Sequence, residues 1–232
     1  MLTATISHDM RTPLNAIISV SKNLINELAV NKPCKKTWTK FLKIVFNSAS
    51  LLNFQVNDLI DLFKIRTGKF KPVDSIVNVH ELVIEIFEVF SIQTKEKGLE
   101  LEVKRELNFP PLLYIDSGRF KQVLVNLISN SLKFTFSGSI QVYLAFDYTH
   151  EKLNVTVADT GIGIDDSDKH RVFEMFSKIE STLLSNTTGI GMGLSISRKI
   201  LSSLGGTIQI EPRNAESQRG TQINFTMDAV HV

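Results

Sequence analysis

Residues 116–135 have the sequence DSGRFKQVLVNLISNSLKFT, in which Leu, Val, Ile and Phe recur at helical spacing. This stretch predicts a strongly apolar helix. Asn126, Asn130 and Lys133 follow one another at i, i+4 and i+7, so they form a polar stripe along that helix. Amide oxygens and an ammonium group on one face suit a polyphosphate with a hard cation, which prefers oxygen ligands. The alternative is a solvated face, which the flanking apolar residues disfavour because solvated faces usually carry Lys and Glu.

Two glycine-containing turns follow this helix along the chain. The stretch VTVADTGIGI, residues 155–164, is typical of a strand that ends at Asp159 and continues into Gly161 and Gly163. An aspartate at a strand end can accept a hydrogen bond from an exocyclic amino group, and glycines allow close approach of the backbone. The stretch TGIGMGL, residues 188–194, opens the next predicted helix. Glycines ahead of a helix N-terminus favour phosphate binding through backbone N–H groups and the helix dipole.

The second turn differs from two other phosphate-binding loops. No Gly-Lys-Ser/Thr follows it, as a Walker loop requires, and no short βαβ unit surrounds it, as in a Rossmann fold. The segment between Phe176 and Gly189 is polar, and a mobile segment ahead of a phosphate-binding turn predicts a lid.

The elements around these motifs predict an α+β two-layer sandwich over residues 77–232, with helices on one face of a mixed or antiparallel sheet. Helical periodicity covers 77–90, 116–134 and 195–204, and strand-like alternation covers 99–107, 139–148, 153–159, 207–211 and 221–227. Lys, Pro and Asp residues cluster just before the sandwich and predict a linker at 69–76.

The N-terminal residues 1–68 predict an all-α helical hairpin. Apolar residues recur at helical steps over 3–29 and 37–66, a connector with Pro33 separates the two stretches, and Gly68 has the position of a C-cap glycine. A lone hairpin leaves two apolar stripes uncovered, so we expect a dimeric four-helix bundle. The alternative is a hairpin packed onto its own C-terminal domain.

His8 is a candidate catalytic residue on the polar side of the first predicted helix. Thr12 shares its face at i+4, and Asp9 can orient the imidazole and make one ring nitrogen a better nucleophile. Pro13 lacks the N–H group that would bond the Asp9 carbonyl, so it predicts a kink beside His8.

The composition excludes several classes of protein. The chain has 232 residues, a formal net charge of +2 and 43% hydrophobic residues, which is typical of a globular protein and argues against a nucleic-acid partner. Cys34 is the single cysteine, which excludes an intramolecular disulfide and disfavours a cysteine-based zinc site. No apolar run approaches the ~20 residues that span a bilayer, and the N-terminus has no signal-peptide pattern. We expect a cytoplasmic chain without membrane contact of its own, and leave open whether a longer protein is membrane-anchored.

Together these motifs resemble those of sensor histidine kinases. SHDMRTPLN, residues 7–15, resembles the H-box, and the stripe of Asn126, Asn130 and Lys133 with Phe134 resembles the N-box. Four further motifs follow in the family's order and resemble its G1 box, F-box, G2 box and closing motif: DTGIG at 159–163, FEMF at 173–176, GIGMGL at 189–194 and GT at 220–221. The resemblance covers nearly the whole chain at the family's spacing.

The resemblance implies a dimerisation and phosphotransfer hairpin followed by an ATP-binding sandwich, of the kind also found in gyrase, heat-shock chaperone and mismatch-repair ATPases. It implies ATP and Mg²⁺ as cofactors, a homodimer, and a response-regulator receiver domain as partner. In the hairpin it implies His8 as the phospho-acceptor, Asp9 as its activating acid, and Thr12 as a residue for dephosphorylating the receiver. The implied nucleotide-binding residues are Asn126, Asn130, Lys133, Phe134, Asp159, Gly161, Gly163, Gly189, Gly191, Gly193, Leu194 and Thr221.

Individual roles follow from the same resemblance. Asn130 would hold Mg²⁺ with Asn126 nearby on the phosphate side, Lys133 would contact phosphate, and Phe134 would pack near the nucleotide. Asp159 would bind the adenine amino group.

The chain departs from the family pattern at a few positions. Asp9 replaces the commoner Glu but keeps the carboxylate. Ser131 stands where alanine is usual and Gly118 lies in the helix-start motif, and we expect neither to touch the chemistry. Few residues precede His8, so we expect the kinase core of a longer protein or a degenerate short copy.

Three functions are compatible with these motifs. The leading one is an ATP-dependent protein histidine kinase that autophosphorylates His8 and passes the phosphoryl group to an aspartate of a receiver domain. The second is a nucleotide-binding ATPase or switch without phosphotransfer, which the complete H-box disfavours. The third is a pseudokinase that serves as a dimerisation scaffold, which the intact Asn130, Asp159 and glycines disfavour.

Overall fold

The computed structural model describes residues 14–24, single positions between 38 and 65, and residues 67–174, 192–211 and 220–232. These residues divide between two compact units, with the boundary between Lys64 and Ile65. Among the described residues, no helix combines the length and the apolar character needed to cross a membrane.

The described part of the first unit is helical, as the periodicity predicted. Residues 14–24 form helix, and so do the described positions from Trp38 onward. The last helical positions lead to Gly68, which has a left-handed φ of 65° and donates its N–H to the carbonyl of Ile65 at 3.2 Å. Gly68 therefore ends this helical stretch as predicted.

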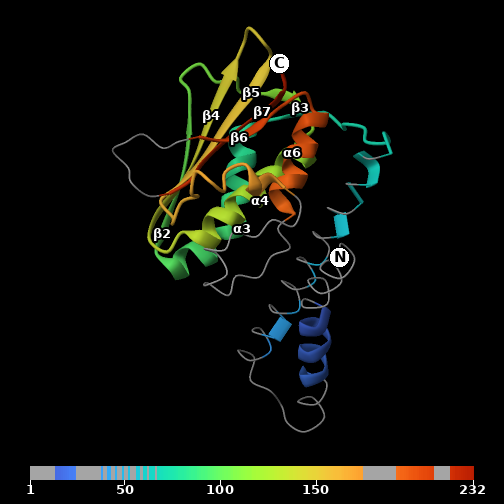
Figure 1. Ribbon diagram of the computed structural model, residues 1–232, viewed down its shortest axis with the longest axis vertical. Helices are drawn as coiled ribbons and strands as arrows, with labels where there is room; N and C mark the ends of the chain where they lie inside the picture. Colours follow the sequence, from blue (N-terminus) through green and yellow to red (C-terminus); the bar gives the residue numbers. More distant parts are fainter. Residues whose placement is uncertain are drawn as a thin grey trace. The chain divides into compact units, whose positions relative to one another are not determined.

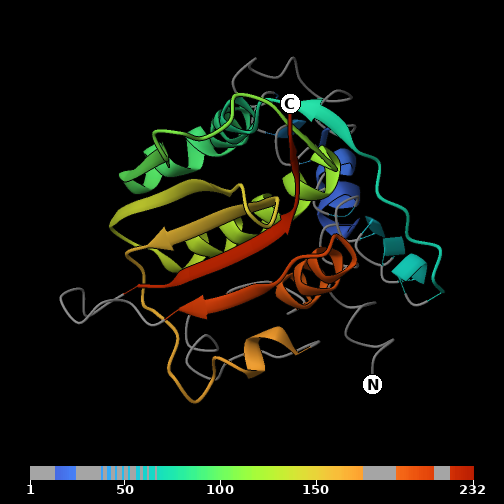
Figure 2. The ribbon, with the colours of Figure 1, turned by 90° about the horizontal axis from the view of Figure 1, so that it is seen from above.

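The second unit is built on a five-stranded mixed sheet. Its strands are β2 (Leu99–Arg105), β4 (Gly138–Asp147), β5 (Lys152–Asp159), β6 (Ile208–Glu211) and β7 (Gln222–Asp228), in the order β2-β4-β5-β7-β6. β2 pairs parallel with β4, and the other neighbours pair antiparallel. Figure 2 shows β4, β5, β7 and β6 side by side, seen from above.

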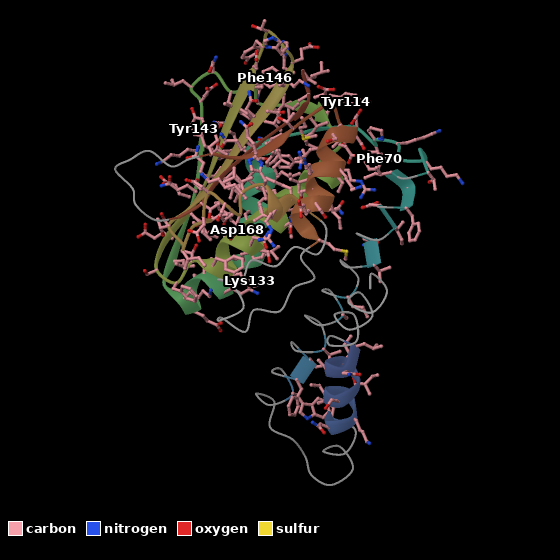
Figure 3. All side chains as sticks on the ribbon, in the orientation of Figure 1. Phe70, Tyr114, Lys133, Tyr143, Phe146 and Asp168 are labelled. Carbon is pink, nitrogen blue, oxygen red and sulfur yellow. The ribbon has the colours of Figure 1, made fainter. Side chains whose placement is uncertain are left out.

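The two faces of this sheet differ in polarity because successive side chains point to opposite sides of a strand. The register places Val142 of β4 opposite Val157 of β5, and Val155 of β5 opposite Phe225 of β7, all of them buried. The alternate positions lie on the other face, where Tyr143 is exposed (Figure 3). One face is therefore the core.

Three helices cover the core face (Figure 1). They are α3 (Val79–Lys97), α4 (Ser117–Phe134) and α6 (Gly193–Ser203). The ring of Phe120 on α4 packs against that of Phe225 on β7, with centroids 6.1 Å apart. The predicted α+β sandwich with helices on one face is confirmed.

Helix α3 is longer than the sequence predicted. It begins after Asn78, whose side chain accepts from the N–H of Glu81, and it continues past Phe90 to Lys97. The residues after Phe90 are mostly polar and hide the helical period, but the chain stays helical until Gly98 adopts a left-handed φ of 65°.

A second, small sheet was not predicted. It consists of β1 (Ser75–Val77), β3 (Leu113–Ile115) and β8 (Val230–His231), in the order β1-β3-β8 and with antiparallel pairing. β1 begins within the range predicted as linker. Strands of two or three residues are too short for a visible alternation, and these three come from distant parts of the chain. A short 3₁₀ helix, η1 (Arg171–Phe173), completes the described elements.

Candidate functional site

The start of α4 is fixed by Asp116, which is buried. Its Oδ1 accepts from the backbone N–H of Arg119 at 3.0 Å, and its Oδ2 accepts from the N–H of Val73 at 2.8 Å. Asp116 is thus the N-cap of α4 and also holds the segment that precedes β1. The Arg119 guanidinium lies over the ring of Phe70, 5.3 Å from its centroid, so the same segment contacts α4 a second time.

The polar stripe predicted on α4 is present and half-buried. Asn126, Asn130 and Lys133 lie on one side of the helix, while Val123, Leu127 and other apolar residues of α4 are buried in the core. The stripe is therefore more enclosed than a solvated helix face. Lys133 lies in the last turn of α4 (Figure 3), with its ammonium 5.0 Å from the centroid of the Phe134 ring.

Asp159 lies at the end of β5 and is 5% exposed. Its Oδ1 accepts from the backbone N–H groups of Gly161 at 2.9 Å and Thr221 at 3.1 Å. Its Oδ2 accepts from the hydroxyl of Ser131 at 2.9 Å. The backbone N–H of Asp159 also donates to the carbonyl of Thr221 at 2.9 Å. Asp159 thus joins β5, α4 and the start of β7.

The turn after Asp159 depends on its two glycines. A Cβ atom at Gly161 would lie 2.6 Å from the carbonyl oxygen of Phe134, so a side chain there would displace the turn from the end of α4. Gly163 has a left-handed φ of 83° and lies close to the backbone of Gly220. The N–H of Ile162 donates to the Phe134 carbonyl at 3.2 Å, which seats the turn on α4.

Asn126 contacts the N-terminal end of α6. Its Nδ2 donates to the hydroxyl of Ser197 at 3.0 Å, and its side-chain oxygen occupies the place that a Cβ at Gly193 would take. A residue larger than glycine at 193 would therefore displace the Asn126 amide from this position. The helix begins after Met192 without a side-chain cap, and Leu194 lies half-buried in its first turn.

The other predicted site residues lie outside the described part of the chain. They are His8, Asp9, Thr12, Gly189 and Gly191. Within the described part, the structure brings predicted site residues together in two groups along α4. Asn126 meets Gly193 at the start of α6, and Phe134, Gly161, Gly163 and Thr221 gather around Asp159.

The described residues fit a nucleotide with a hard cation. No group of three or more His, Cys, Asp or Glu side chains gathers among them to hold a metal ion. The candidate ligand is the amide oxygen of Asn130, a half-buried side chain that makes no hydrogen bond to any residue described. Asp159 Oδ2 accepts one bond from the chain, so the oxygen retains a lone pair for a ligand N–H group.

Two residues of the site were missed in the sequence. Ser131 was expected to stay clear of the chemistry, and in the structure its hydroxyl donates to the carboxylate of Asp159, a predicted site residue. Ser197, the partner of Asn126, was not singled out. For Ser131 the sequence did offer a signal. Ser131 is a polar residue next to the polar stripe, on the apolar side of the helix, at a position where the family usually has alanine. For Ser197 the sequence offered no signal.

Two family matches cover most of the chain. Residues 115–231 match the family described as "Histidine kinase-, DNA gyrase B-, and HSP90-like ATPase", and residues 1–68 match the "His Kinase A (phospho-acceptor) domain". Among curated relatives, the aerobic respiration control sensor protein ArcB of Escherichia coli K12 is 31% identical over 231 residues. That alignment covers 99% of this chain and 28% of ArcB.

Solved structures share the fold. Full-length ShkA in complex with AMPPNP superposes with a TM-score of 0.71 at 24% identity, over 99% of this chain and 46% of ShkA. Histidine kinase ThkA in complex with the response regulator TrrA gives a TM-score of 0.59 at 24% identity, over 97% of this chain and 60% of ThkA. The ATPase match spans half of the chain and the phospho-acceptor match most of the remainder. The chain therefore belongs to the histidine kinase family.

Proposed function

We propose that this chain is the core of an ATP-dependent protein histidine kinase that autophosphorylates His8 and passes the phosphoryl group to an aspartate of a response-regulator receiver. The observation that carries the proposal is the buried Asp159 carboxylate at the end of β5, bonded to α4 through Ser131, in an ATPase-type sandwich that follows a phospho-acceptor domain. An acceptor-only carboxylate held by three donors is suited to one further N–H donor, such as the 6-amino group of adenine.

The nucleotide-binding residues divide by chemistry. Asp159 binds the adenine amino group, while Gly161, Gly163 and Thr221 hold its carboxylate and the adjoining turn. Asn126 would lie on the phosphate side, Lys133 would contact phosphate, and Phe134 would pack near the nucleotide. Gly189, Gly191, Gly193 and Leu194 complete the proposed nucleotide-binding residues. Mg²⁺, when bound at Asn130, neutralises charge on the phosphates.

The proposed reaction has two transfers. In the first, a neutral imidazole nitrogen of His8 attacks the γ-phosphorus of ATP, the bond to the β–γ bridging oxygen breaks, and ADP leaves. Asp9 orients the ring and accepts a hydrogen bond from its other nitrogen. In the second, the N–P bond breaks and a carboxylate oxygen of the receiver's aspartate takes the phosphoryl group. Thr12 would position the water molecule that hydrolyses the aspartyl phosphate of the receiver.

The partners of the whole protein are part of the proposal. The chain spans 28% of the length of ArcB, which is named as a sensor protein. ThkA was solved with a response regulator, and this chain carries a phospho-acceptor match, which supports a receiver as partner. We further propose a homodimer through the helical hairpin and a cytoplasmic location for these residues.

Incubation with ATP labelled at the γ-phosphate tests the proposal. A kinase gives protein-bound label that is stable to base and labile to acid, because a phosphoramidate hydrolyses in acid. An ATPase without phosphotransfer gives free labelled phosphate only, and a scaffold gives neither. Either of the last two outcomes refutes the proposed kinase.

A further inference from the structure

Ser131 brings a hydroxyl group to the buried side of Asp159. It lies on α4 next to Asn130, is 6% exposed, and donates to Asp159 Oδ2 at 2.9 Å. The two residues are 28 positions apart in the sequence. The contact therefore ties the helix of the polar stripe to the strand that carries the carboxylate.

We propose that Ser131 is a positioning residue that makes the nucleotide site select adenine over guanine. The inference rests on the proposed function, because it concerns the base of the same nucleotide that Asp159 would bind. Ser131 acts through Asp159. Its hydroxyl holds the Asp159 carboxylate in place and restricts which groups of a ligand can form a hydrogen bond with that carboxylate.

The hydrogen-bond donors around Asp159 determine what a ligand meets there. An ionised carboxylate only accepts hydrogen bonds and offers about four lone-pair positions. Oδ1 accepts two backbone N–H groups, from Gly161 and Thr221, and Oδ2 accepts the hydroxyl of Ser131. One position is left on Oδ2. It can accept an N–H from the 6-amino group of adenine, whereas the 6-oxo group of guanine would place lone pairs against lone pairs.

The serine hydroxyl adds to this selection because it has one hydrogen. That hydrogen is directed to Oδ2, so the hydroxyl itself offers lone pairs only. Neither Asp159 nor Ser131 can then donate to an oxo group. With alanine at 131, the space next to Oδ2 would suit a water molecule, which has two hydrogens and can donate to the carboxylate and to an oxo group together.

The contact is one of several between the turn after Asp159 and the end of α4. The turn after Asp159 also bonds the end of α4 through Ile162 and Phe134 at 3.2 Å, and Gly161 leaves no room for a side chain there. Loss of the Ser131 hydroxyl therefore leaves the backbone of the site in place, which allows its effect on the base to be measured separately.

Equilibrium binding of three nucleotides to the full chain tests the inference. The nucleotides are ATP, GTP and the triphosphate of purine riboside, which has hydrogen in place of the 6-amino group. The variants are Ser131→Ala, Ser131→Cys, which replaces the hydroxyl by a somewhat larger and weaker donor, and the matched control Thr94→Val, which removes a buried hydroxyl bonded within α3.

In Ser131→Ala, the ratio of ATP affinity to GTP affinity should fall about tenfold, the scale of one hydrogen bond to a charged group. GTP should bind as before or more tightly, and the purine riboside triphosphate should change less than about twofold, because it lacks the group that Ser131 helps to select. Ser131→Cys should fall between the parent and Ser131→Ala, and Thr94→Val should match the parent.

Two outcomes overturn the inference. An unchanged ratio of ATP to GTP affinity in both Ser131 variants means that the hydroxyl does not select the base. An equal loss for all three nucleotides means that it only supports the fold. A parent chain that binds none of the three refutes the proposed function itself, which is a distinguishable result.

Discussion

Asp159 remains a buried carboxylate because three donors surround it, two of them from distant parts of the sequence. Ser131, Gly161 and Thr221 each give it one hydrogen bond. A buried charge without such partners would be strongly unfavourable, and hydrogen bonds to charged groups are about twice as strong as neutral ones. The residue that would bind the ligand is therefore also the residue that holds the turn, the helix and the strand together.

We predict that Asp159→Asn weakens ATP binding by about 1.5–3 kcal/mol, the usual worth of a hydrogen bond to a charged group. Its amide carries one acceptor oxygen, which the backbone N–H groups of Gly161 and Thr221 would keep. The NH₂ group would then lie where Oδ2 was and would face the adenine amino group donor to donor. GTP binding should improve for the same reason.

Titration of ATP and GTP measures this change. Asp147→Asn is the matched control, since Asp147 is an acid at the end of β4 that bonds His150 and not the site. If Asp159→Asn binds both nucleotides as the parent does, its role in adenine recognition is wrong.

We predict that His8→Ala abolishes acid-labile labelling but leaves ATP affinity within about twofold, because His8 lies in the phospho-acceptor match and the nucleotide residues lie in the ATPase match. The measurement combines labelling from γ-labelled ATP with nucleotide titration. His150→Ala, which changes an exposed histidine of the sandwich, should label normally. If acid-labile label persists in His8→Ala, the phospho-acceptor is a residue other than His8.

At the scale of elements, the length of a helix or strand decided whether the sequence could predict it. The long elements α4, β4 and β5 carry a clear period, and their predicted and observed bounds differ by one residue at most. The strands of the small sheet are too short to show one. The contact of Ser131 with Asp159 also escaped prediction, because spacing along a helix places a residue on a face but does not tell which distant residue that face meets.

We predict that Asp116→Ala lowers the free energy of unfolding by about 2 kcal/mol. The change removes the N-cap of α4, worth about 1 kcal/mol, and leaves the partly buried N–H of Val73 without its acceptor. Denaturation followed by circular dichroism measures the loss. Asn78→Ala removes the more exposed cap of α3, which makes one such bond, and should cost about half as much.

The comparison of these two caps is the critical result. Asp116→Asn keeps one acceptor oxygen and should recover part of the lost stability. Equal costs for Asp116→Ala and Asn78→Ala would mean that the bond to Val73 contributes nothing, and that the segment before β1 is held by its other contacts.

At the scale of the whole molecule, the second unit has a buried apolar core, whereas the described positions of the first unit include no buried apolar side chain. The sheet and its helices enclose a continuous core that includes Phe120, Phe225 and Leu144, each at most 1% exposed. The described part of the first unit instead leaves six large apolar side chains exposed, among them Phe63 at 68%. They are Leu14, Ile18, Leu42, Val56, Ile60 and Phe63.

These exposed side chains predict a homodimer through the first unit. Val56, Ile60 and Phe63 recur at steps of four and three, so they share one face of a helix, and burying such a face against a second copy gains about 25 cal/mol per Å² of apolar surface. Light scattering at micromolar concentration should give twice the chain mass of 26.1 kDa.

The double variant Ile60→Glu with Phe63→Glu should give a monomer, because two charges cannot be buried unpaired at the interface. The control Val89→Glu changes an equally exposed apolar residue on α3 and should remain dimeric. A monomeric parent chain would instead favour the alternative in which the hairpin covers its apolar face within its own chain.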